Sequence, residues 1–193
     1  GANVDDPEIA SSTRDGLAVL LHDVGRPEEA EPLARQALEE RRNRLGEDDP
    51  LTLNSTSNLA LIIESQGRFP EAETLYREAL AGRRRVLGDE STETLVTLNN
   101  LGSLMRTVNR LDEAETLLRE ALATRTRVFG EDHPARLVPL NNLGLTLNAQ
   151  GKLVEAEAIC REVLAAREQL LGWDHKATLT ARNNLANVLT ALD

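Results

Sequence analysis

Residues 110–125 read RLDEAETLLREALATR, and three further segments of the chain carry the same pattern. They are RPEEAEPLARQALEER at 26–41, RFPEAETLYREALAGR at 68–83 and KLVEAEAICREVLAAR at 152–167, each 42 residues from the next. Apolar residues in every copy fall three and four positions apart, which is typical of an amphipathic helix. The early glutamate and the final arginine complement the helix dipole. The chain is therefore one helical unit repeated in tandem.

Glycines predict where the helices of each unit end. A second helix is expected before each quoted segment, with a turn residue between the two. In the second unit the first helix, helix A, is expected from about Pro50 to Gln66, and helix B from about Pro70 to Leu87. Turn residues are expected at Gly25, Gly67, Asn109 and Gly151 after helix A, and left-handed C-cap residues at Gly46, Gly88, Gly130 and Gly172 after helix B.

The order of N-L-A/G, Gly, E-A-E and A-L in each unit resembles the tetratricopeptide repeat (TPR). The 42-residue period and the junction GEDHP at 130–134 resemble the long variant found in kinesin light chains. The resemblance implies an all-α fold, a right-handed superhelical solenoid of tandem helix pairs with nine helices, forming one domain over 1–193. The repeats would span 6–46, 47–88, 89–130 and 131–172, followed by an unpaired helix A over 173–193.

Prolines predict how the A helices begin. Asp49-Pro50 and His133-Pro134 are typical of an N-cap followed by proline in the first turn. Pro139 departs from the repeat because it falls inside the fourth helix A, five residues after Pro134. It is expected to remove one hydrogen bond and bend that helix.

Paired asparagines interrupt helix A in three units, within LNNLG at 98–102 and 140–144 and within RNNLA at 182–186. Asn lowers helix stability because its side chain competes for backbone hydrogen bonds, so a specific role is expected for the pairs. At about 100° per residue, Asn99 falls nearly opposite the apolar stripe and Asn100 at its flank. Neither asparagine is therefore expected in the core.

Steps of 42 residues extend these positions into two ladders. The family resemblance implies that helix A lines a concave groove holding peptides, with the flanking ladder on the peptide backbone. A carboxamide both donates and accepts, as an extended peptide requires. A second role stays open, in which a flanking asparagine bonds to the neighbouring helix without a ligand. The outward ladder is Asp15, Ser57, Asn99, Asn141 and Asn183, and the flanking ladder is Gly16, Asn58, Asn100, Asn142 and Asn184.

Binding is the preferred role for the outward asparagines. The expected groove carries Asp15, Asp23 and Glu64 toward its N-terminal end and Arg106 in the middle, with Asn, Thr, Ala and Leu in its C-terminal half. Kinesin light chain grooves are basic, so the cargo-adaptor function of that family is not transferred. The candidate peptide-binding residues are Asn58, Asn99, Asn100, Ser103, Arg106, Asn141, Asn142, Asn148, Asn183 and Asn184.

Composition argues against several other functions. The net charge of −10, from 22 basic and 32 acidic residues, disfavours nucleic acid, and the polar composition disfavours a membrane span. Cys160 occupies the position of Ala34, Tyr76 and Leu118 in the other units, which indicates a core residue and no catalytic nucleophile. No pattern for a metal, a cofactor or a catalytic site is found.

The sequence therefore predicts a non-catalytic module that binds a peptide or protein segment in its groove. The alternative is a sensor or scaffold segment of a larger signalling protein, such as a kinase or a nucleotide-switch ATPase. The single cysteine and the start GANVDDPE, which lacks a secretory signal, predict a cytoplasmic location. The apolar stripe Leu185, Val188, Leu189 and Leu192 on the last helix predicts weak self-association through residues 179–192.

Overall fold

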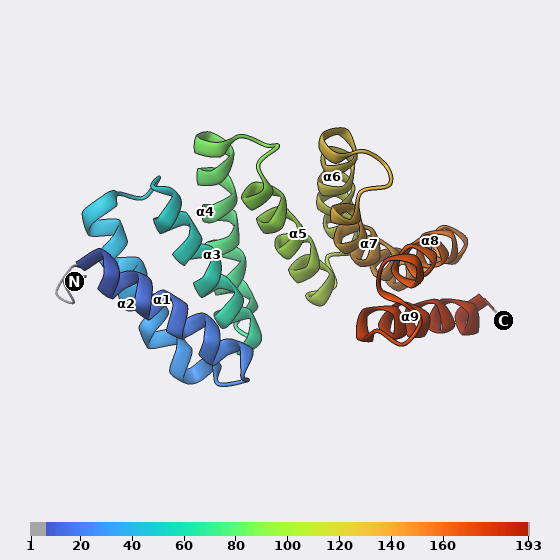
Figure 1. Ribbon diagram of the computed structural model, residues 1–193, viewed down its shortest axis with the longest axis horizontal. Coiled ribbons are helices and arrows are strands. Elements are labelled where there is room, and N and C mark those ends of the chain that lie inside the picture. The colour runs from blue at the N-terminus through green and yellow to red at the C-terminus, as the bar shows by residue number, and fades with distance from the viewer. Residues whose placement is uncertain (1–6, 193) are drawn as a thin grey trace. The chain divides into compact units, whose positions relative to one another are not determined.

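The computed structural model describes residues 7–192, in which nine α-helices and one 3₁₀ turn form and no strand does (Figure 1). The all-α expectation is confirmed. The start of the first predicted repeat, at residue 6, lies outside this range. The helices are α1 (Pro7–Asp23), α2 (Pro27–Leu45), α3 (Pro50–Ser65), α4 (Phe69–Leu87), α5 (Thr92–Thr107), α6 (Leu111–Phe129), α7 (Leu137–Ala149), α8 (Leu153–Leu171) and α9 (Lys176–Leu192).

The chain forms two compact units, one up to Thr97 and the other from Leu98 onward. In the first unit α1 packs on α2, α2 on α3 and α3 on α4. In the second unit the same order continues from α6 through α7 and α8 to α9. Within each unit these helices thus pack on their neighbours in sequence, as expected for stacked helix pairs that cannot bury their apolar faces alone.

Small residues allow the two helices of a pair to approach closely. A side chain at Gly102 would place its Cβ 2.9 Å from Cγ of Leu118, and one at Gly144 would place it 3.0 Å from Cγ2 of Ile159. Ala18 occupies the corresponding place in the first pair and is fully buried. Helix A therefore packs its backbone against side chains of helix B.

Helix starts are capped as the sequence predicts. The Asp49 side chain accepts a hydrogen bond from Leu51 N at 2.8 Å. His133 Nδ1 accepts one from Ala135 N at 3.1 Å. These bonds satisfy backbone donors that have no partner within the helix.

The structure changes the expectation for Pro139. A 3₁₀ turn, η1 (Pro134–Arg136), precedes α7, so Pro139 lies in the first turn of α7, where backbone N–H groups have no helical partner. The carbonyl oxygen of Ala135, four residues earlier, accepts a hydrogen bond from Arg125 Nη1 at 2.6 Å. The predicted bend inside a continuous helix is wrong, because the α-helix begins after the 3₁₀ turn.

The turns between helix A and helix B adopt the left-handed conformation, and one of them does so without glycine. Gly25, Gly67 and Gly151 have φ values of 77°, 77° and 75°, and Asn109 has a φ of 61°. Asn109 N donates to Arg106 O and the next N–H donates to Met105 O, which is the bonding of a Schellman motif. Asn tolerates this conformation better than other residues with a side chain.

Substitutions at Asn109 test this backbone requirement. Asn109→Gly should raise the free energy of unfolding by about 0.5 kcal/mol, because glycine enters the left-handed region without steric cost. Asn109→Val should lower it by about 1–2 kcal/mol, because a β-branched side chain is strained there. Urea-induced unfolding measures both, and equal stability of the two variants would contradict the assignment.

Ion pairs connect helix B of one repeat to the next repeat. In the second unit Glu115 of α6 accepts hydrogen bonds from Arg119 Nε at 2.9 Å and from Lys152 Nζ at 2.6 Å. Arg119 also donates to Glu155 of α8 at 2.6 Å. The hydrogen bond from Lys152 lowers the pKa of Glu115 to about 2, although partial burial opposes the shift.

The pKa of Glu115 predicts a loss of stability in acid. Because the folded-state pKa lies below the ordinary value of 4.5, the contribution of this carboxylate is complete above pH 4.5 and declines as the pH falls toward 2. Glu115→Gln should therefore lower the melting temperature at neutral pH and matter less at about pH 3. Glu28→Gln, at an exposed position, is the control. An effect of Glu115→Gln that grows in acid would contradict the sign.

Candidate functional site

An arginine near the end of each helix B anchors the start of the next helix A. Arg41, Arg83 and Arg125 are buried and Arg167 is partly buried. Each donates from Nη1 to a backbone oxygen ten residues further on. The acceptors are Leu51 O at 3.2 Å, Glu93 O at 2.9 Å, Ala135 O at 2.6 Å and Ala177 O at 2.9 Å.

The position of these arginines at the end of helix B predicts only a role in the helix dipole, and the structure adds a cross-link between repeats. The sequence contains a signal for this role, because all four units have arginine at this position of helix B and none has lysine there. A lysine has neither the planar fork nor the number of donors that this geometry uses. Burial lowers the pKa of Arg83, Arg125 and Arg167, because removal from water penalises the charged form.

In the first repeat this arginine has a buried carboxylate partner. Arg41 Nη1 lies 2.9 Å from Asp15 Oδ2, and both side chains are almost inaccessible. Asn58 Nδ2 donates to the same oxygen at 3.2 Å. Asp15 is therefore neutralised inside the first unit and is not the free groove charge that the sequence analysis expected.

In the second unit the two asparagine ladders are joined to each other. Asn142 Nδ2 donates to Asn99 Oδ1 at 3.1 Å, and Asn184 Nδ2 donates to Asn141 Oδ1 at 3.1 Å. A flanking residue of one repeat thus bonds to the outward residue of the preceding repeat. These contacts match the alternative role that the sequence left open for the flanking ladder. Peptide binding by the ladders stays a prediction.

The outward direction predicted for Asn99 is wrong. Asn99 is 6% exposed, and Ser57 and Asp15 of the same ladder are 8% exposed. A helical wheel describes one helix alone, whereas Asn142 of the next helix A bonds to Asn99 on this flank of α5. Asn183 is exposed, and the other candidates are partly exposed: Asn58, Asn100, Ser103, Arg106, Asn141, Asn142, Asn148 and Asn184.

A hollow of about 320 Å³, named the α9 hollow, lies in the second unit where α9 begins. Asn141 is the one sequence-predicted candidate in its lining. The hollow also contains two cationic side chains that the sequence analysis did not place in the groove, whose C-terminal half was expected to be uncharged. A sequence signal for Lys176 exists, because it is the one charged residue at a position that holds Pro50, Thr92 and Pro134 in the other units. The lining is Asn141, Arg167, His175, Lys176, Ala177 and Thr180.

The electrostatics of the α9 hollow suit an anion. Arg167 donates to the backbone oxygen of Ala177. Among residues 7–192 it has no carboxylate partner. Lys176 is exposed at the first turn of α9, where the helix dipole also favours negative charge. His175 Nδ1 caps this turn by accepting from Ala177 N at 3.1 Å. The hollow thus presents two cationic donors and the Thr180 hydroxyl.

Cys160 is a core residue, as the sequence predicts. It is 5% exposed and packs with Leu118, Leu143 and Leu147. Burial raises the pKa of its thiol, which disfavours the reactive thiolate. Across residues 7–192, no three His, Cys, Asp or Glu side chains gather as metal ligands, and no helix is both long and apolar enough to cross a membrane.

The comparisons with known proteins agree with this architecture. The tetratricopeptide repeat model matches residues 8–84, 53–127, 93–158 and 137–193, so the chain belongs to the tetratricopeptide repeat family. No curated protein sequence matches it. TPR arrays are protein–protein interaction modules, and their fold is generally not catalytic.

Solved structures show the same all-α TPR solenoid fold. The nearly identical TPR-like repeats of Podosopora anserina, assigned to a kinesin light chain, share 24% identity with a TM-score of 0.81, over 98% of this chain and 89% of that one. BtubC (BKLC) from P. vanneervenii shares 26% identity with a TM-score of 0.81, over 96% and 74%. The resemblance to kinesin light chain repeats is therefore confirmed.

Asp15→Asn tests the buried pair of the first repeat. The substitution leaves Arg41 without a carboxylate, as Asn141 leaves Arg167 in the fourth repeat. We expect the free energy of unfolding to fall by about 1–3 kcal/mol, because Arg41 loses its buried carboxylate partner. The loss is no larger because the new amide still accepts a hydrogen bond. Asp23→Asn, which removes an exposed charge from the same helix, should change it by less than about 0.5 kcal/mol. Equal effects of the two substitutions in urea unfolding would refute the pair's role.

Proposed function

We propose that this protein is a non-catalytic module that binds a peptide or protein segment on the face formed by its A helices. In this proposal a carboxylate of the ligand occupies the α9 hollow. The observation that supports it is a difference between the first and the fourth repeat at equivalent positions. The first repeat holds its own carboxylate against the buried arginine, and the fourth repeat presents the same donors without one.

The correspondence between the two places extends to three residues. Asp15, Arg41 and Asn58 of the first repeat correspond, three repeats further on, to Asn141, Arg167 and Asn184. In the first repeat both Arg41 and Asn58 donate to one oxygen of Asp15. With the neutral Asn141, one hydrogen bond from Asn184 persists, and Arg167 has no carboxylate partner among the described residues. An external carboxylate restores the missing interaction.

The surroundings of the hollow supply further contacts for an extended ligand. Lys176 and Arg167 provide charge-assisted hydrogen bonds to a carboxylate, which are stronger than neutral ones. Asn183 is exposed on the same helix and offers a carboxamide to the peptide backbone. Asn100, Ser103, Arg106 and Asn148 stay candidates for contacts further along the A helices.

The test compares selected peptides on matched variants. Decapeptides selected from a random library for binding to the protein should be enriched in Asp or Glu, or bind through a free C-terminal carboxylate. Asn141→Asp supplies an internal carboxylate and Lys176→Gln removes a donor, so each should weaken binding about tenfold, or 1.4 kcal/mol. Arg161→Gln removes a positive charge of the same unit outside the hollow, at an exposed residue that pairs with Glu157 of its own helix, and is the control.

Two results would count against the proposal. Selected peptides that bind Asn141→Asp as tightly as the original protein would exclude the carboxylate seat. A selection that yields no binding peptide at all would exclude peptide binding itself. Fluorescence polarisation at about 0.15 M salt gives the affinities, since lower salt exaggerates surface charge.

The remaining expectations on context stay predictions, namely a cytoplasmic location, membership of a larger signalling protein and weak self-association through residues 179–192. The expected self-association depends on how much of the apolar surface of α9 is exposed. Leu185 and Val188 are buried in the core of the second unit, while Leu192 and Leu179 are 39% and 43% exposed.

A further inference from the structure

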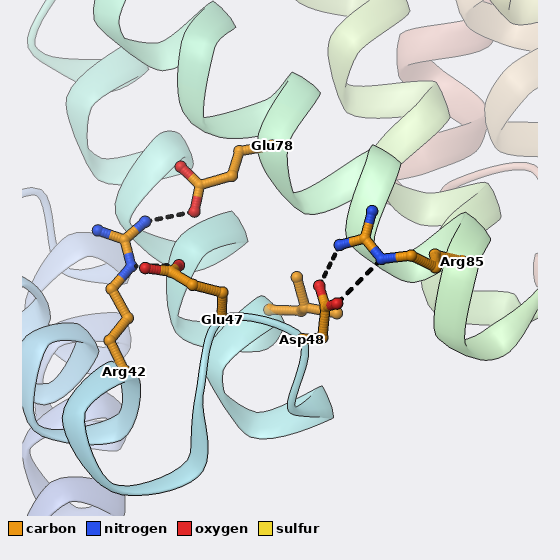
Figure 2. Close-up of a pocket in the computed structure, with 6 residues that line it drawn as sticks. Arg42, Glu47, Asp48, Glu78 and Arg85 are labelled. Carbon is orange, nitrogen blue, oxygen red and sulfur yellow. Dashed lines mark hydrogen bonds and ion pairs between the residues drawn. The ribbon is translucent and has the colours of Figure 1, made fainter.

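Two hollows occupy equivalent places at the junctions between repeats. The first edge hollow lies in the first unit and has a volume of about 370 Å³ (Figure 2). The second edge hollow lies in the second unit and has a volume of about 680 Å³. Four lining residues of the first, Glu47, Asp48, Leu53 and Glu78, correspond two repeats further on to Glu131, Asp132, Leu137 and Glu162 of the second.

The first edge hollow is filled by two arginines of the chain itself. Arg42 Nε lies 3.0 Å from Glu47 Oε2, and its Nη2 bonds to Glu78. Arg85 Nε donates to Asp48 at 2.9 Å and a second nitrogen bonds to the other oxygen, a two-pronged pairing. Figure 2 shows both guanidinium groups pointing toward these carboxylates. Every carboxylate of this hollow thus has a guanidinium partner.

The second edge hollow lacks both arginines. Thr126 stands in the place of Arg42, and Gln169 in the place of Arg85. Glu131 and Asp132, both exposed, make no ion pair within the described part of the chain. The acidic positions are therefore kept while their cationic partners are replaced by neutral residues, and the hollow is larger.

Arg136 compensates only one side of the second edge hollow. Its Nη2 lies 3.6 Å from Glu162, its Nε donates to Thr126 Oγ1 at 2.9 Å, and its Nη1 bonds to Glu131 O. Arg136 thus serves the place that Arg42 serves in the first unit. The place that corresponds to Arg85, beside Asp132, has no guanidinium.

We propose that the second edge hollow binds an arginine side chain of a basic segment in a partner protein, with Asp132 as its main anchor. The equivalent carboxylate in the first unit already binds a guanidinium through both oxygens, which shows that the local backbone supports this pairing. A planar guanidinium fits this geometry better than the point charge of lysine.

The shape and the charge of the site support this occupant. Leu137 and Leu170 line the hollow and offer apolar contact to the methylene groups of an arginine. The chain as a whole carries a net charge of −10, which steers basic partners toward it. This site lies apart from the residues that line the α9 hollow and selects the opposite charge, so the inference is independent of the proposed function.

The probe is a fluorescein-labelled peptide, acetyl-ALRALRA-amide, measured by fluorescence polarisation at about 0.15 M salt. Its counterpart with citrulline in place of arginine has the same shape without the charge. We expect the arginine peptide to bind and the citrulline peptide to bind at least tenfold more weakly. Equal binding of the two peptides, or no binding of the arginine peptide, would overturn the inference.

Variants of the protein locate the site. Asp132→Asn should weaken binding of the arginine peptide at least tenfold, and Gln169→Arg should abolish it by supplying the internal guanidinium that the first unit has. Asp174→Asn, an exposed junction position one repeat further on, is the matched control and should have no effect. Equal losses with Asp132→Asn and Asp174→Asn would mean non-specific attraction and would overturn the inference.

A stability measurement separates loss of binding from loss of folding. Gln169→Arg should keep or raise the melting temperature, because the new guanidinium pairs with Asp132 as Arg85 pairs with Asp48. Asn141→Asp and Lys176→Gln should leave binding of the arginine peptide unchanged. Loss of this binding in the latter two variants would place the peptide in the α9 hollow and overturn the inference.

Discussion

The hydrogen bond from the arginine near the end of each helix B to a backbone oxygen ten residues further on is the contact on which each repeat junction depends. It fixes the end of one helix pair against the beginning of the next, and it places a buried or partly buried cation at each of these junctions. A buried guanidinium is costly unless its donors are satisfied. The backbone oxygen satisfies part of this demand everywhere, and the differences between repeats lie in how the remaining charge is balanced.

This remaining charge distinguishes repeats that are alike in fold. Asp15 balances Arg41 inside the first unit, whereas Asn141 leaves Arg167 charged at the edge of a hollow. At the two edge hollows the same contrast occurs for a negative charge. Asp48 pairs with Arg85 in the first, whereas Gln169 takes the place of that arginine near Asp132 in the second. Within each comparison the first unit satisfies its charges internally, and the second unit presents them to solvent. Surface specificity in this protein therefore arises from single substitutions on a repeated scaffold.

Much of the fold was predictable because its information is local. The period of the glycines, the Asp49 and His133 caps and the apolar spacing each depend on neighbouring residues, and the structure contains them as predicted. The burial of Asn99 was not predictable from one helical wheel, since a residue of the next repeat covers it. Lys176 and Arg167 were missed because they come from α9 and α8 and meet Asn141 only after α7, α8 and α9 have packed. The 3₁₀ turn before α7 was also not predicted, because Arg125 of the preceding helix bonds to Ala135 O only after the two segments have packed.

The short sequence separation of the stabilising contacts also determines how such a chain folds. The arginine cross-links join residues ten positions apart, and the asparagine bonds join residues 43 positions apart. The entropy cost of closing a loop grows only slowly with its length, and proteins dominated by local contacts fold rapidly. In a linear array of this kind a nucleus can form in any repeat and grow toward either end. A repeat whose buried charge is balanced internally, such as the first with Asp15 and Arg41, is the place where growth should begin and where unfolding should finish.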